Sequence, residues 1–159
     1  AVQPRMLGLG SLTVELKEGW DGFAKDIGPP HEQVPALYVA NVPWPDRGQN
    51  FADAVTLEPF EALPPEGVVI AASASSSGGE EFRHVLRRPV TLSDGHFLAD
   101  SYEGQPAPHV STQIISGRLG EQSLSIHVYF GRNDPTDEMR AEANHVLATL
   151  EITAASERR

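Results

Sequence analysis

The sequence predicts an α+β domain, an antiparallel sheet of about five to six strands with a C-terminal helix and a short helix packed on it. A helical stripe of apolar residues near the C-terminus and a strictly alternating strand just before it are the two clearest signals. The chain has 159 residues, 40% hydrophobic and 21% charged, as expected of one globular domain. We therefore expect a single domain, 1–159, with an ordered core at about 11–153 and a tail at 154–159.

The C-terminal helix is predicted from about Pro135 to Ala148. Asp134 is a suitable N-cap, and Pro135 fits the first helical position because its missing N–H costs nothing there. The apolar stripe along the helix consists of Met139, Ala143, Val146, Leu147 and Leu150. A short last strand is expected to follow at 150–153.

The clearest strand is predicted at 123–130, where Leu124, Ile126, Val128 and Phe130 alternate with polar residues. The β-rich segment 110–116 precedes it, and the turn residues at 117–121 make the two a hairpin. Companion strands are expected at 11–17, 36–42 and 68–74, with a weaker one at 96–101. A single helical turn is expected at 58–63, and loops at 42–48 and 73–79.

The charge of the chain narrows the class of partner. The formal net charge is -10, which repels nucleic acid and anionic lipid surfaces. No apolar run approaches the roughly 20 residues of a membrane-spanning helix, so we expect no direct membrane insertion. The chain has no cysteine, which excludes disulfides, thiolate metal sites and a cysteine nucleophile.

No motif for catalysis or for a cofactor occurs in the sequence. The nucleophile elbow, the Ser-x-x-Lys pair and the phosphate-binding glycine loop are all missing, so we expect no cofactor. Histidines and carboxylates do gather between 84 and 109, and the residues concerned are His84, Asp94, His96, Asp100, Glu103 and His109. Their spacing is irregular, which favours a solvated loop over a metal site.

Three aromatic or imidazole side chains are the candidates for a binding surface. His127 and Tyr129 are expected on the polar face of the predicted strand, beside Ser125, where they form either a polar groove or an ordinary solvated sheet face. Trp44 stands between two prolines on a rigid loop and either anchors a partner or caps the core. For Trp20, at the end of a strand, we expect a core position.

Three segments of the chain resemble a set of uncharacterised exported actinobacterial domains. They are the strand leading into Gly19-Trp20-Asp21-Gly22, the segment Tyr38-Val39-Ala40-Asn41, and the closing Val128-Tyr129-Phe130-Gly131 with the helix that follows it. The resemblance covers about 12–152. In element order the chain is also similar to the PsbP-like α/β/α sandwich. The resemblance implies an exported domain, often tethered to the cell envelope, without an agreed activity and without catalytic residues.

These observations favour a non-catalytic extracytoplasmic binding or accessory module for a protein or a small ligand, with a processed or truncated N-terminus before Ala1. The alternative is a metal-assisted or histidine-based hydrolase, which requires His127, or two of the loop histidines, to meet a carboxylate in a pocket. A sensor or accessory domain of an envelope system, anchored upstream of Ala1, is a third possibility. The sequence leaves the oligomeric state open.

Overall fold

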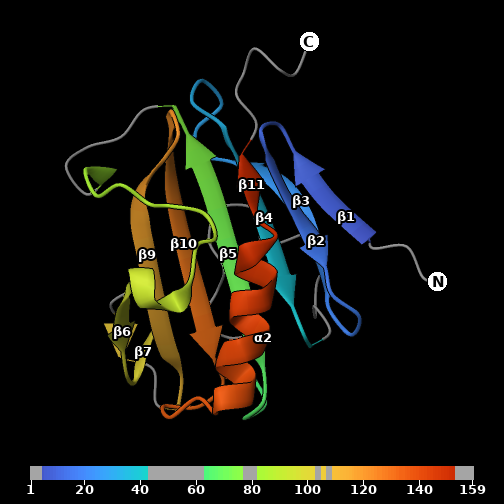
Figure 1. Cartoon of the computed structure of the whole chain (residues 1–159), viewed down its shortest axis with the longest axis vertical. Coiled ribbons are helices and arrows are strands. Elements are labelled where there is room, and N and C mark those ends of the chain that lie inside the picture. The colour runs from blue at the N-terminus through green and yellow to red at the C-terminus, as the bar shows by residue number, and fades with distance from the viewer. Residues whose placement is uncertain (1–4, 43–62, 77–81, 103–104, 107–108, 153–159) are drawn as a thin grey trace.

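The computed structural model describes residues 5–42, 63–76, 82–102, 105–106 and 109–152. These residues form a six-stranded sheet, a three-stranded sheet, a two-stranded ribbon and one α-helix (Figure 1). Every strand pair is antiparallel. The α+β class predicted from the sequence is confirmed, although the strands divide between two main sheets where one was expected.

The six-stranded sheet has the order β3-β4-β5-β10-β9-β6. Its strands are β3 (Asp21–Ile27), β4 (Val34–Ala40), β5 (Val68–Ser75), β6 (His96–Leu98), β9 (Ser111–Leu119) and β10 (Gln122–Phe130). The β9–β10 hairpin is longer than predicted, because pairing continues to Leu119 opposite Gln122 and leaves only Gly120 and Glu121 in the turn. Gly120 supplies the positive φ, +66°, that this tight turn needs.

The three-stranded sheet has the order β1-β2-β11. It consists of β1 (Arg5–Leu9), β2 (Leu12–Leu16) and β11 (Glu151–Ile152), so it joins the two ends of the described chain (Figure 1). The ribbon pairs β7 (Ser101–Tyr102) with β8 (Gln105–Pro106). A 3₁₀ turn, η2 (Leu92–Asp94), lies just before β6.

The helix α2 (Asp137–Ala148) begins two residues later than predicted. Its N-cap is Thr136 and not Asp134, because the Thr136 hydroxyl accepts a hydrogen bond from the Met139 N–H at 3.1 Å. Asp137 and Glu138 in the first turn complement the helix dipole. Among the described residues, no helix is long and apolar enough to cross a membrane.

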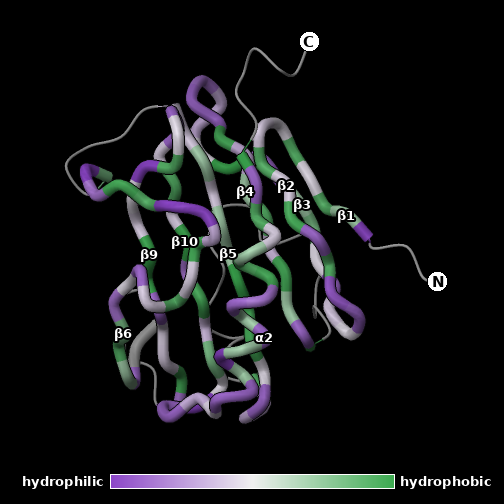
Figure 2. The backbone as a smooth tube through the Cα atoms, in the orientation of Figure 1, coloured by the Kyte–Doolittle hydropathy of each residue, from purple (hydrophilic) through white to green (hydrophobic). Residues whose placement is uncertain are grey.

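The larger core lies on the face of the six-stranded sheet that is covered by α2 and β2. It contains four side chains of β10 together with the predicted helical stripe, all of them buried, and the four are Leu124, Ile126, Val128 and Phe130. Figure 2 shows hydrophobic residues concentrated along the central strands and hydrophilic ones at the loops. A second apolar cluster occupies the opposite face, which we call the second face, and it consists of Ala36, Tyr38, Ala40, Val69, Val110 and Tyr129.

Trp20 is 1% exposed and belongs to the larger core, as predicted. Its indole N–H is buried without a hydrogen-bond partner among the described residues. The predicted helical turn at 58–63 and the predicted loop at 42–48 both fall almost entirely outside the described residues, and Trp44 lies outside them. The strands β1 and β3 were not predicted from the sequence.

Candidate functional site

The second face of the six-stranded sheet carries the predicted binding residues His127 and Tyr129. Both lie on β10, and the His127 Nδ1 is 3.1 Å from the Tyr129 hydroxyl. The two rings meet edge to face, with centroids 6.0 Å apart. Tyr129 is 1% exposed and His127 is half-buried, so a partner at this face would meet the imidazole and not the phenol.

Three serines from three neighbouring strands lie next to this pair. Register places Ser125 of β10 between Ser73 of β5 and Ser116 of β9, and alternation puts all three on the second face beside His127. We call Ser73, Ser116 and Ser125 the serine row. Each of the three is half-buried, and within the described part of the chain none of their hydroxyls has a hydrogen-bond partner. The row therefore offers donors and acceptors on three adjacent inner strands of the sheet.

A cation marks the hairpin end of the same face. The Arg118 Nη1 donates to the Ser123 hydroxyl at 3.4 Å, and its Nη2 donates to the Glu121 carbonyl at 3.1 Å. On the other side of the serine row, Phe23 of β3 stacks on Tyr38 of β4 with ring centroids 5.0 Å apart, in the same register row as His127. The second face thus changes from aromatic to hydroxyl-lined to cationic along its strands.

The Tyr129 hydroxyl is one of the groups that His127 contacts. Within the described residues, none of the hydroxyls of the serine row bonds to His127. A nucleophilic serine needs a base within hydrogen-bond reach and a group that orients that base. The serine row and His127 lack this arrangement in the described structure.

The histidines and carboxylates between 84 and 109 are dispersed. No group of three or more potential metal ligands occurs among the residues that the structure describes, and Glu103 falls outside them. Asp94 closes a capping box by accepting from the Thr91 N–H at 2.9 Å, so it serves the turn η2. His96 shares the second face with His127, but it is two strands away, roughly 10 Å.

Asp100 has a structural role at the base of the β7–β8 ribbon. Its carboxylate accepts from the Asn133 side chain at 2.6 Å and from the His109 N–H at 3.3 Å, and its own N–H donates to the Asn133 Oδ1 at 2.8 Å. The Asn133 hydrogen bond, with that of the His109 N–H, lowers the pKa of Asp100. Asp100 and His109 both have positive φ, so this contact holds two unusual backbone turns together.

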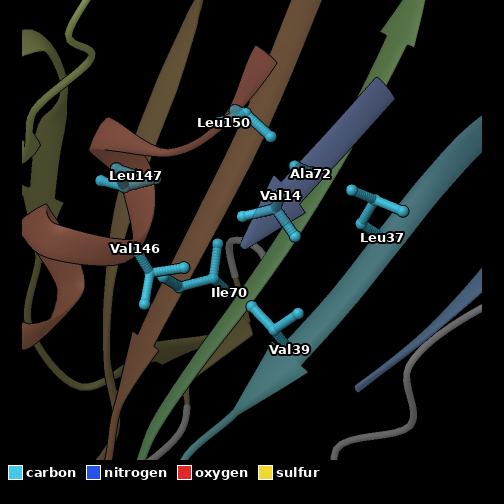
Figure 3. Close-up of a pocket in the computed structure, with 8 residues that line it drawn as sticks. All are labelled: Val14, Leu37, Val39, Ile70, Ala72, Val146, Leu147 and Leu150. Atoms are coloured by element: carbon cyan, nitrogen blue, oxygen red, sulfur yellow. The ribbon is translucent and has the colours of Figure 1, made fainter. Parts of the chain in front are cut away.

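The larger core contains a small cavity of about 10 Å³ between α2, β2 and the sheet (Figure 3). Its lining is apolar and consists of Val14, Leu37, Val39, Ile70, Ala72, Val146, Leu147 and Leu150. A water molecule needs a site of about this size or larger and two to four polar partners. The cavity is a packing defect and not a ligand site.

Sequence reasoning placed Ser125, His127 and Tyr129 on one face of a strand but missed Ser73 and Ser116. They are far from Ser125 along the chain, and only the strand register brings them together. The position of Trp44, the third predicted contact, lies outside the described residues. The chain matches no family model, and comparisons with curated proteins and with solved structures found no similar protein.

Proposed function

We propose that this domain is a non-catalytic binding or accessory module that works outside the cytoplasm and uses the serine row and His127 to hold a protein or a small ligand. The observation that carries the proposal is the half-buried hydroxyl row on the three central strands β5, β10 and β9. Apolar side chains are the usual way to pack a central strand, so a polar stretch here needs a polar neighbour.

The side chains indicate the chemistry of the ligand. The serine row supplies uncharged donors and acceptors, and His127 lies beside it with the methyl group of Ala71 as its neighbour on β5. Such a surface fits hydroxyl or amide groups better than phosphates or carboxylates. We expect a polyol or a peptide to bind, with Trp44 as a further candidate contact from the sequence.

A thermal-shift screen tests the proposal with sugars, short peptides, nucleotides, lipids and divalent metals as probes. A probe at about 100 times its Kd stabilises the fold by about 2.7 kcal/mol, which raises the Tm by roughly 5 to 11 °C for a domain of this size. The Ser125→Leu variant places a bulky apolar group in the middle of the row and should abolish the shift.

The matched control is Gln122→Leu, which adds the same side chain to β10 on the opposite face and near the hairpin end. This variant should keep the shift. A shift that survives in Ser125→Leu would place the ligand elsewhere. Hydrolysis of a p-nitrophenyl ester that is lost in His127→Gln would contradict the non-catalytic proposal and support the hydrolase.

A further inference from the structure

The spacing of the serine row is determined by the strand register. The β9–β10 hairpin closes through a two-residue turn with Leu119 opposite Gln122, so these two residues form a hydrogen-bonded pair. Hydrogen-bonded and non-hydrogen-bonded pairs alternate along an antiparallel ladder. Ser116 and Ser125 are three steps further along, and they therefore form a non-hydrogen-bonded pair with Cα atoms about 4.5 Å apart.

The other half of the row follows from the pairing of β10 with β5. The Gly131 N–H donates to the Gly67 carbonyl at 3.0 Å, in continuation of the β5–β10 register. Ser125 and Ser73 are an even number of steps from this pair, so they form a hydrogen-bonded pair with Cα atoms about 5.5 Å apart. The strands β5, β10 and β9 are neighbours in the sheet (Figure 1). The three hydroxyl-bearing residues thus lie on a line across the strands with a mean spacing of about 5 Å.

This spacing separates the two ligand classes that the serine row accepts by its chemistry. An extended peptide advances by about 3.4 Å per residue, so its groups on one side recur every 7 Å or so and do not match the row. A β-1,4-linked chain of pyranose sugars is straight, and it advances from ring to ring by a distance close to the spacing of the row. Successive rings turn over, but both edges of each ring carry hydroxyl groups. Each serine can therefore meet a hydroxyl of its own ring.

The residues beside the serine row match the apolar part of a sugar ring. Two residues further along the same three strands, register aligns Ala71 of β5, His127 of β10 and Ile114 of β9 on the second face. Ala71 and Ile114 are half-buried, so part of each apolar side chain remains accessible. A pyranose ring has a polar edge and an apolar C–H surface. A ring that lies over both rows places its hydroxyls on the serines and its C–H groups on the apolar side chains.

The ends of the serine row limit how many rings it holds. On one side the next register position is Ala36 of β4, which is 2% exposed and has no hydroxyl. On the other side Ser116 lies between Ile114, where the pairing of β6 with β9 ends, and Arg118, where the bridge from Val85 begins. The row therefore fits three rings, and a fourth ring would project beyond β9.

We propose, on the basis of the proposed function, that the serine row binds a straight, β-linked oligosaccharide across the strands, with one ring over each of β5, β10 and β9. The sugar is neutral, because a chain with a net charge of -10 repels an anionic polysaccharide. The nearest cation, Arg118, already donates to the Ser123 hydroxyl and to the Glu121 carbonyl.

The test is an NMR titration of the whole ¹⁵N-labelled chain with cellobiose, cellotriose and cellotetraose, which contain two, three and four β-linked glucose rings. Cellotriose should bind about three to ten times more tightly than cellobiose, because its third ring adds a hydrogen bond and an apolar contact. Cellotetraose should stay within about twofold of cellotriose, since its fourth ring has no serine to meet. Maltotriose is the matched control, with the same three glucose rings in a curved α-linked chain, and it should bind no better than cellobiose.

Three variants assign the rings to the serines. Ser125→Ala removes the central hydroxyl and should weaken both cellobiose and cellotriose, whereas Ser73→Ala or Ser116→Ala removes an end hydroxyl and should abolish the advantage of the third ring. Thr13→Ala, a half-buried hydroxyl on β2 of the other sheet, is the control and should bind like the wild type.

Two results would overturn the oligosaccharide proposal, namely equal affinities for cellotriose and maltotriose, or no gain from cellobiose to cellotriose. If only a peptide shifts the amides of the serine row, the oligosaccharide proposal fails and the proposed function stands. If no probe shifts these amides, both fail.

Discussion

Leu147 of α2 holds the helix against the sheet, and its truncation to alanine should be strongly destabilising. The side chain is 1% exposed and belongs to the larger core. Truncation removes three carbons, which at about 0.8 kcal/mol each costs roughly 2.4 kcal/mol in transfer free energy. It also enlarges the existing cavity of about 10 Å³ that Leu147 lines, which adds on the order of 1 kcal/mol or more. We expect a total loss of about 3 to 4 kcal/mol.

Urea unfolding followed by circular dichroism measures this loss, with an unchanged m-value as the sign that only stability has changed. The Tm should fall by about 6 to 16 °C. Arg140→Ala, an exposed position on the same helix, should stay within about 0.5 kcal/mol of wild type. A loss below about 1 kcal/mol for Leu147→Ala would refute the packing of α2 on the sheet.

Three further predictions concern local structure. Thr136→Ala removes the N-cap hydroxyl of α2 and should lower the free energy of unfolding, measured with urea, by about 1 kcal/mol. Thr136→Ser keeps a hydroxyl at this position and should retain most of that stability. Asn133→Ala should raise the pKa of the Asp100 carboxyl toward its ordinary value of 3.8, which an NMR titration measures. Because the pKa of Asp100 is lowered in the folded wild type, the stabilisation by this contact is present at neutral pH and is lost on acidification below about pH 4. Gly117→Ala would place a Cβ 2.5 Å from the His84 carbonyl oxygen and 2.7 Å from the Leu86 Cγ. The variant should therefore lower the Tm by several degrees. An unchanged Tm would contradict the close approach of residues 84–86 to β9.

The elements predicted well from sequence are those whose own residues determine their structure. In β10, alternation separates the buried Leu124, Ile126, Val128 and Phe130 from the half-buried Ser125 and His127. In α2 the apolar stripe matches the buried positions. The strand β3 was missed because Asp21, Gly22 and Asp26 are poor strand residues, and pairing with β4 overrides their preference. The early residues of β1 lack alternation and become a strand by pairing with β2.

The candidate site could be predicted only in part, for a similar reason. His127 and Tyr129 share a face because they are two residues apart on one strand. Ser73 and Ser116 join them through the register of three strands, which no local pattern encodes. The burial of Tyr129 also depends on packing on the second face. For that reason the position of Tyr129 in the sequence could not show whether its ring is buried or exposed.

The measurement that tests the central proposal most directly is an NMR map of a bound probe. The ¹⁵N-labelled chain would be titrated with the polyol or peptide that gives the largest thermal shift. The proposed function predicts that the amide shifts gather at Ser73, Ser116, Ser125 and His127, and that they disappear in Ser125→Leu. Shifts gathered on α2, on β1 or along the edge of β3, with the serine row unchanged, would contradict it.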